Sequence, residues 1–286
     1  MKYAFIREQR PKHRLNILCS TLGVSTSGYH DWLERPLSKT ARDNKRLVTK
    51  IRCFHKASRS TYGSPRIQKD LTNDGEIVSR QRVARLMKSV SIESKMAKRF
   101  VITTHSKNTT SPAPDLLKRN FRTKSINQAW VSDTTFIRTR QGWLYLATML
   151  DLYSRKVIGW AMSDRNDTKL VCDALMMAHW RQGKVKDVIV HSDQGSTYAS
   201  NEYRRLLKEH NMQCSMSRKG KCHDDAVAVS FFSSLKTELI DDEDYFTRSE
   251  AKTSIFEYIE VFYNRQRRHS YLGYISPIEY EQANAF

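Results

Sequence analysis

The chain has 286 residues, 39% of them hydrophobic, and its 49 Lys and Arg against 30 Asp and Glu give a formal net charge of +19. This length allows two or three small domains, and the excess of positive charge favours a polyanionic partner. No apolar run is long enough to span a bilayer, the N-terminus lacks a secretory apolar core and no long basic amphipathic helix stands out, so we expect a cytoplasmic, nucleoid-associated protein with no membrane partner.

The N-terminal residues are predicted to be helical and to form two segments. Residues 12–34 carry two apolar stripes separated by Gly23, a pattern that resembles a helix-turn-helix but is equally typical of ordinary helix packing. We therefore expect a short helix-turn-helix-like segment over residues 1–40. A helical DNA-binding domain is expected over residues 41–92.

The second segment begins with a helix predicted over residues 41–57. Ser64 precedes Pro65, an order that favours Ser64 as the cap of a second helix. A third helix is predicted to begin near Ser79. A short basic helix after a tight turn suits the major groove or the phosphate backbone of DNA, so we predict DNA contacts for Arg80, Arg82 and Arg85.

Residues 93–126 are basic, polar and proline-containing without an apolar period, which indicates a linker. The pattern then changes to strands at 129–139, 143–150 and 156–162, a helix at 168–181, a strand at 188–190, a helix at 200–210, a strand at 213–216 and a helix at 224–238. Three strands followed by alternating helices and strands is the order of an RNase-H-like fold. We expect an α/β core over residues 127–240, with a mixed five-stranded sheet flanked by helices.

The C-terminal residues 241–286 are predicted to form a helical tail. Thr247 and Glu250 have the spacing of a capping box, and the apolar stripe that follows is expected to pack on the core domain. A basic run comes after that stripe, and we predict phosphate contacts for Arg265, Arg267 and Arg268.

Two aspartates stand in strand-like sequence and are the candidate metal ligands. Asp133 lies in Trp-Val-Ser-Asp-Thr-Thr-Phe-Ile and Asp193 in Val-Ile-Val-His-Ser-Asp-Gln-Gly-Ser. Ligand sites of open α/β sheets lie at the carboxyl ends of strands. Two carboxylates placed there beside a helix would hold divalent metal, as phosphoryl transfer on nucleic acid requires. The structural alternative is that each aspartate caps a neighbouring helix or turn.

Several separate blocks of sequence resemble bacterial insertion-sequence transposases of the two-reading-frame kind. These blocks are Trp-Val-Ser-Asp133, His-Ser-Asp193-Gln-Gly-Ser, Ser-Met-Ser-Arg-Lys-Gly with Asp-Asp-Ala-Val-Ala, and Phe-Tyr-Asn-Arg-Gln-Arg-Arg-His-Ser-Tyr-Leu-Gly-Tyr-Ile-Ser-Pro. The resemblance covers nearly the whole chain. It implies a retroviral-integrase-type core that uses two aspartates and a glutamate to bind Mg²⁺, with Mn²⁺ as the alternative ion, and that cuts DNA at element ends and joins them to target DNA.

The resemblance places the third acidic residue of the family at position 229, after 35 intervening residues, and this chain has Val229 there. Valine cannot ligate a metal ion, so we expect the fold and DNA binding to persist with much reduced cleavage and joining. Asp225 lies one helical turn earlier and is the only neighbouring acid on nearly the same face, about 5–6 Å away along the axis.

Further contacts to DNA are expected around this helix. Lys236 lies two turns after position 229 on the same face, where it would meet a phosphate near the cut site. The loop before the helix is basic, and its predicted DNA contacts are Arg218, Lys219 and Lys221.

The partners implied by the resemblance are double-stranded DNA, both the terminal inverted repeats of the element and the target, further copies of the chain on that DNA, and a first-frame protein or a fusion with it. Two alternatives remain open. One is a catalytically inactive relative that occupies DNA ends and regulates active copies. The other is a simple RNase-H-like nuclease, which would give nicked products but no joined ones.

Overall fold

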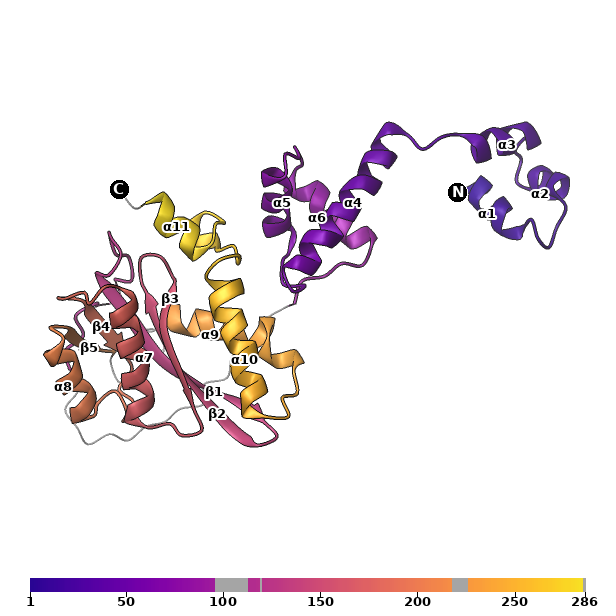
Figure 1. Ribbon diagram of the computed structural model, residues 1–286. Helices are drawn as coiled ribbons and strands as arrows, with labels where there is room; N and C mark the ends of the chain where they lie inside the picture. The colour runs from indigo at the N-terminus through magenta and orange to yellow at the C-terminus, as the bar shows by residue number, and fades with distance from the viewer. Residues whose placement is uncertain (96–112, 119, 218–225, 285–286) are drawn as a thin grey trace. The chain divides into compact units, whose positions relative to one another are not determined.

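The computed structural model describes residues 1–95, 113–118, 120–217 and 226–284, and the chain divides into two units, Met1–Cys53 and Phe54–Phe286. The first unit holds α1 (Lys2–Gln9), α2 (Leu15–Thr21), α3 (Thr26–Glu34) and the first part of α4 (Lys39–Ala57), which continues into the second unit (Figure 1). The two helices predicted within 12–34 are confirmed as α2 and α3. No separate helix was predicted at α1. Its residue Ile6 packs with Cys19 of α2 and Tyr29 of α3, and these three side chains form a small core.

In the second unit, α5 (Ser64–Asn73) and α6 (Arg80–Ser89) pack as a pair through buried aliphatic side chains, Ile67, Leu71, Val83, Leu86 and Met87. The predicted helix start near Ser79 is confirmed, and the Ser79 hydroxyl caps α6 by accepting the Arg82 N–H at 3.3 Å. The predicted Ser64 cap is wrong. Gly63 occupies the cap position and Ser64 is the first residue of the helix, so proline stands in the first turn one place later than predicted.

Five strands form one sheet in the order β3-β2-β1-β4-β5. Antiparallel pairs join β1 (Ala129–Thr139) to β2 (Gly142–Asp151) and β2 to β3 (Val157–Ser163). Parallel pairs join β1 to β4 (Ile189–Ser192) and β4 to β5 (Gln213–Met216). The mixed five-stranded RNase-H-like sheet predicted from the element order is therefore confirmed.

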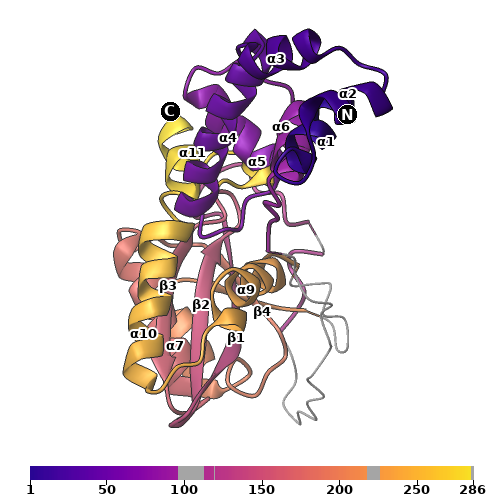
Figure 2. The same cartoon turned by 90° about the vertical axis from the view of Figure 1, so that its right-hand side faces the viewer.

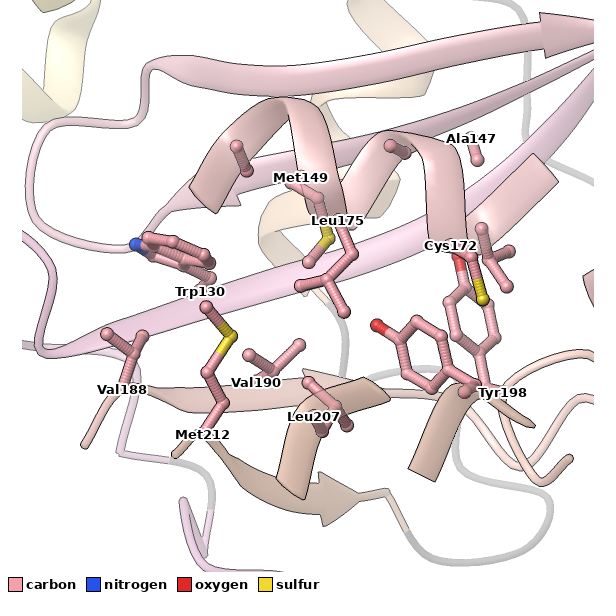
Figure 3. Close-up of a cluster of buried hydrophobic side chains, with 14 of the residues drawn as sticks. Trp130, Ala147, Met149, Cys172, Leu175, Val188, Val190, Tyr198, Leu207 and Met212 are labelled. Atoms are coloured by element: carbon pink, nitrogen blue, oxygen red, sulfur yellow. The ribbon is translucent and has the colours of Figure 1, made fainter. Parts of the chain in front are cut away.

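One face of the sheet is covered by α7 (Thr168–Arg181) and α8 (Asn201–Glu209) (Figure 1). The side chains of their cap residues, Asp167 and Ser200, each accept a backbone N–H. Gly159 of β3 lets α7 approach closely, since a Cβ there would collide with the carbonyl of Ala174. Figure 3 shows the resulting core, in which Trp130, Met149, Leu175, Val190, Tyr198, Leu207 and Met212 meet between the sheet and these helices.

The other face carries α9 (Ala226–Glu238) and α10 (Arg248–Glu257), which lie on the viewer's side of the sheet in Figure 2 and pack on β1 and β2. A 3-10 turn, η2 (Ile240–Asp242), follows α9. The predicted tail continues from α10 through a π-helical turn, η3 (Tyr258–Tyr263), and a 3-10 turn, η4 (Ser270–Leu272), to α11 (Pro277–Ala283).

The predicted capping box at the start of α10 is only half formed. Thr247 accepts the Glu250 N–H, but the Glu250 carboxylate takes the N–H of Phe246 instead of that of the cap residue. A complete box stands at α11, between Ser276 and Glu279. In the described part of the chain, no helix combines the length and apolar character needed to cross a membrane.

Candidate active site

Asp133 and Asp193 stand at the same level of two neighbouring parallel strands. The last registered pair of β1 and β4 is Val131 with His191, and each aspartate follows its strand's member of that pair by two residues. Side chains two apart on a strand share a face. The sheet therefore brings the two carboxylates together at the carboxyl end of β4, as the sequence predicted for open α/β sheets.

Each carboxylate is only partly exposed and is oriented by a backbone N–H close to it in sequence. Asp133 Oδ1 accepts the Thr134 N–H at 2.7 Å, and Asp193 Oδ1 accepts the Gly195 N–H at 2.8 Å. A Cβ at residue 195 would lie 2.8 Å from that same oxygen, so a glycine is needed for the backbone to approach.

Asp133 and Asp193 both bind a proton more tightly than an ordinary surface aspartate does. Burial, and then the negative charge of Asp193, raise the pKa of Asp133 to about 7, against the lowering effects of the Thr134 N–H and the Lys236 ammonium. Burial raises the pKa of Asp193 as well, opposed by the Gly195 N–H. A cation bound between the two carboxylates would offset their negative charges and favour the ionised form of both groups.

Tyr198 supports β1 on both sides of Asp133, and sequence reasoning did not identify it. Its hydroxyl lies 2.9 Å from Ser132 Oγ and 3.1 Å from Thr134 Oγ1. The ring is buried in the core beneath the sheet (Figure 3). Its position in the Ser-Thr-Tyr run just after Asp193 was the one available signal, because a loop that follows a candidate ligand commonly returns to the site.

Position 229 lies on the helix that packs beside these carboxylates. Val229 is half-buried on α9, which packs against β1. Lys236 follows it by seven residues, two turns along the same face. The Lys236 ammonium is close enough to lower the pKa of Asp133 and lies 5.4 Å from the centre of the Phe136 ring. The face of α9 that carries Val229 and Lys236 is thus turned toward the end of β1.

Among residues 1–95, 113–118, 120–217 and 226–284, no group of three or more His, Cys, Asp or Glu side chains is arranged to hold a metal ion. The paired aspartates thus have no third acidic neighbour in that part of the chain. Asp225, the only substitute ligand considered from the sequence, lies outside the described residues, as do the predicted DNA contacts Arg218, Lys219 and Lys221.

Asp151 ends β2 and is paired with Trp130, three residues before Asp133 on β1. Its Oδ1 accepts the N–H groups of Tyr153 and Ser154 at 2.9 Å each, and Oδ2 accepts that of Asn127 at 2.8 Å. The carboxylate is fully engaged in holding the β2–β3 turn and the entry to β1, a structural role.

The other predicted DNA contacts divide by exposure. Arg80 and Arg85 of α6 and Arg265 of the tail are exposed, and Arg82 is half-buried. Arg267 is buried and binds Glu238, so a phosphate contact for Arg267 is wrong for this structure. Arg268 is also held inside, 2.6 Å from Asp70. Both guanidinium groups already have carboxylate partners, and a basic run in sequence does not reveal this.

Comparison with known proteins agrees with this geometry. Models described as "Integrase core domain" match residues 123–222 and 229–284, and one described as "HTH-like domain" matches residues 42–100. The transposase InsF for insertion sequence IS3A of Escherichia coli strain K12 is 38% identical over 286 residues, 99% of each chain. An uncharacterized 31 kDa protein of insertion element IS600 from Shigella sonnei is 41% identical over 93% of this chain and 97% of its own.

Among solved structures, the chain is similar to one titled as a simian T-cell lymphotropic virus intasome in complex with the PP2A regulatory subunit B56 gamma. The TM-score is 0.47 at 14% identity, with 74% of this chain and 69% of the other covered.

The sheet order, the paired aspartates and the facing helix define an integrase-type core of the polynucleotidyl transferase class. Sequence identity to InsF, which extends over 99% of each chain, narrows this class to one family. The chain belongs to the family of insertion-sequence transposases that includes InsF of IS3.

Proposed function

We propose that this transposase binds the ends of an insertion sequence in double-stranded DNA and retains the cleavage and strand-transfer site in a severely weakened form. The observation that carries the proposal is the pairing of Asp133 and Asp193 beside a helix whose facing position is Val229. Family membership supports DNA transposition in general. The weakened cleavage and strand transfer that we propose for this chain follow from Val229.

The donor chemistry fits a divalent cation. Asp133 and Asp193 offer adjacent oxygen ligands, the kind that Mg²⁺ and Mn²⁺ prefer. Burial raises the pKa of both groups, and the charge of Asp193 raises that of Asp133 further, so a bound cation would favour the ionised form of both carboxylates. When bound, such an ion activates the attacking oxygen and stabilises the leaving one. The protein's own contribution is to orient the two carboxylates through Thr134 and Gly195, and to present Lys236 to a phosphate next to the cut.

Val229 removes one anionic ligand from this arrangement. An apolar side chain on α9 folds well against the sheet but leaves the cation with two carboxylates instead of three. Misplacement by about 1 Å can cost two orders of magnitude in rate, so loss of a whole ligand is expected to cost at least as much.

The deciding experiment compares the chain with Val229→Glu in Mg²⁺-dependent cleavage and joining of a labelled element end. We expect Val229→Glu to raise the rate by at least about a hundredfold. The matched control is Val227→Glu, which adds the same charge to the same helix two residues, and so roughly 200°, away from position 229. Equal, robust activity in the unaltered chain and in Val229→Glu would refute the proposed weakening.

A second candidate function is occupation of DNA ends without any cleavage. The same observation at position 229 favours it, and it predicts salt-sensitive DNA binding with no product at any Mg²⁺ or Mn²⁺ concentration. An RNase-H-like nuclease would instead produce nicks that are never joined. Product analysis on one gel separates all three.

The remaining assignments complete the proposal. The helical residues 41–92 serve as a DNA-binding domain through Arg80, Arg82 and Arg85, residues 93–126 link it to the core at 127–240, and residues 241–286 form a supporting tail. Because two element ends must be joined together, several copies act on one DNA molecule, together with a first-frame protein or as a fusion with it. The protein works where DNA lies, in the cytoplasm.

A further inference from the structure

An exposed pair of aromatic side chains stands on the β1–β2 hairpin beyond the candidate ligands. Phe136 and Trp143 are 43% and 47% exposed, and their rings meet edge to face with centres 5.1 Å apart. Aromatic rings that are exposed to this extent leave apolar surface in contact with water, so a clustered pair points to a binding surface.

The pair lies at a defined distance from the candidate ligands. Phe136 follows Asp133 by three residues on the same strand, which corresponds to about 10 Å along β1. The two residues have opposite parity and so point to opposite faces of the sheet. β4 ends at Ser192, and among the described residues the pairing of β1 along this edge stops at Val131. Lys236 bridges the edge from α9, since its ammonium acts on the Asp133 carboxylate and lies 5.4 Å from the Phe136 ring.

Positive charge accompanies the rings. Arg138 is exposed and pairs across the hairpin with Trp143. Lys236 lies near both the Asp133 carboxylate and the Phe136 ring. Aromatic faces interleaved with cations suit unpaired nucleotides, whose bases stack on the rings while their phosphates meet the cations.

We propose that Phe136 and Trp143 form a stacking platform for an unpaired base at the end of the DNA strand that is held near Asp133 and Asp193. This inference rests on the proposed binding of DNA ends, and it names the side chains that would contact an unpaired base at such an end. The platform recognises the π-face of a base, so it favours no particular sequence.

The test measures affinity of the full chain for two duplexes of equal length, one blunt and one with a short single-stranded tail that carries a fluorescent base analogue. The unaltered chain should bind the tailed duplex about tenfold more tightly, as expected for one stacked base. Trp143→Leu and Phe136→Leu should each remove most of this preference. Phe136→Tyr keeps a ring and should retain it.

The matched control is Trp180→Leu. Trp180 is also exposed, at 58%, and has a cation over its ring, Lys184 at 4.3 Å, but it lies on α7 away from the hairpin. Its substitution should leave the preference unchanged. Circular dichroism of each variant establishes that the fold is retained.

Three results would overturn the platform, and they have different meanings. If both duplexes bind equally and salt-sensitively, the platform is wrong while end binding stands. If Trp143→Leu keeps the tail preference but changes the sedimentation of the chain, the pair is a contact between copies. If neither duplex binds, the platform fails together with the proposed function.

Discussion

Arg267 donates hydrogen bonds of 2.7–3.0 Å to both carboxylate oxygens of Glu238, the last residue of α9, and both side chains are more than nine-tenths buried. Tyr258 of η3 donates to the same carboxylate at 2.8 Å. Burial alone would lower the pKa of Arg267, but Glu238 and the neighbouring tyrosines raise it. The helix that presents Val229 and Lys236 is thus fastened at its end to the C-terminal tail.

This buried pair predicts a large loss of stability on Glu238→Ala. The substitution leaves the Arg267 guanidinium buried without its carboxylate partner, which typically costs about 3–5 kcal/mol. Chemical denaturation of the full chain measures it. The control Arg205→Ala breaks an exposed pair with Glu209 and should cost less than about 1 kcal/mol. Similar losses in the two variants would contradict a structural role for the Glu238–Arg267 pair.

The raised pKa of Asp133 predicts that the folded protein loses stability as pH rises. The folded carboxyl holds its proton up to about pH 7, while the unfolded one releases it near pH 3.8. The folded state therefore binds more protons between these values, and the stability that this contributes is present below pH 3.8 and is lost as pH rises through 7.

Asp133→Asn removes this titration. Its gain in stability over the unaltered chain should grow by up to about 4 kcal/mol between pH 4 and pH 8, because three pKa units correspond to that energy. Urea denaturation across this range measures the difference. Asp173→Asn, at an exposed carboxylate on α7, serves as the control. A pH-independent gain would show that Asp133 ionises normally in the fold.

Divalent cations should stabilise the chain through the same two carboxylates. Mg²⁺ or Mn²⁺ at ten times its Kd would add about 1.4 kcal/mol, seen as a higher Tm. The effect should be stronger at pH 8 than at pH 6, since the ion competes with the proton on Asp133. Asp193→Asn should abolish it and Val229→Glu should lower the Kd. Equal stabilisation of the Asp193→Asn variant would place the ion elsewhere.

The exposed cations of α6 should govern the salt dependence of DNA binding. Arg80→Ala and Arg85→Ala are each expected to reduce the slope of log affinity against log salt concentration by about 1. Binding titrations at several salt concentrations measure the slope. Arg205→Ala again provides a control, because it removes an exposed cation from α8. An unchanged slope in both α6 variants would remove this helix from the interface.

Much of the core could be read from local patterns. The strand at Ala129–Thr139, the helix at Thr168–Arg181 and the position of Asp193 just beyond β4 agree with prediction. These features depend on alternation, capping side chains and chain order, all of which act over a few residues. The Ser64 cap failed by one position because either residue before Pro65 can precede a helix that has proline in its first turn.

Contacts between residues far apart in the chain could not be predicted from local sequence patterns. The sequence by itself determined the class of fold and the two strand-end aspartates, which follow from periodicity and element order, and it determined the valine at position 229 through the resemblance to a known family. Only the tertiary structure decided that Arg267 and Arg268 face carboxylates inside the protein, that Tyr198 braces β1 and that two aromatic rings stand exposed beside the site. Burial and pairing depend on which distant segments the fold brings together, and a charged or aromatic residue looks the same in sequence whether it meets solvent, a partner side chain or a ligand.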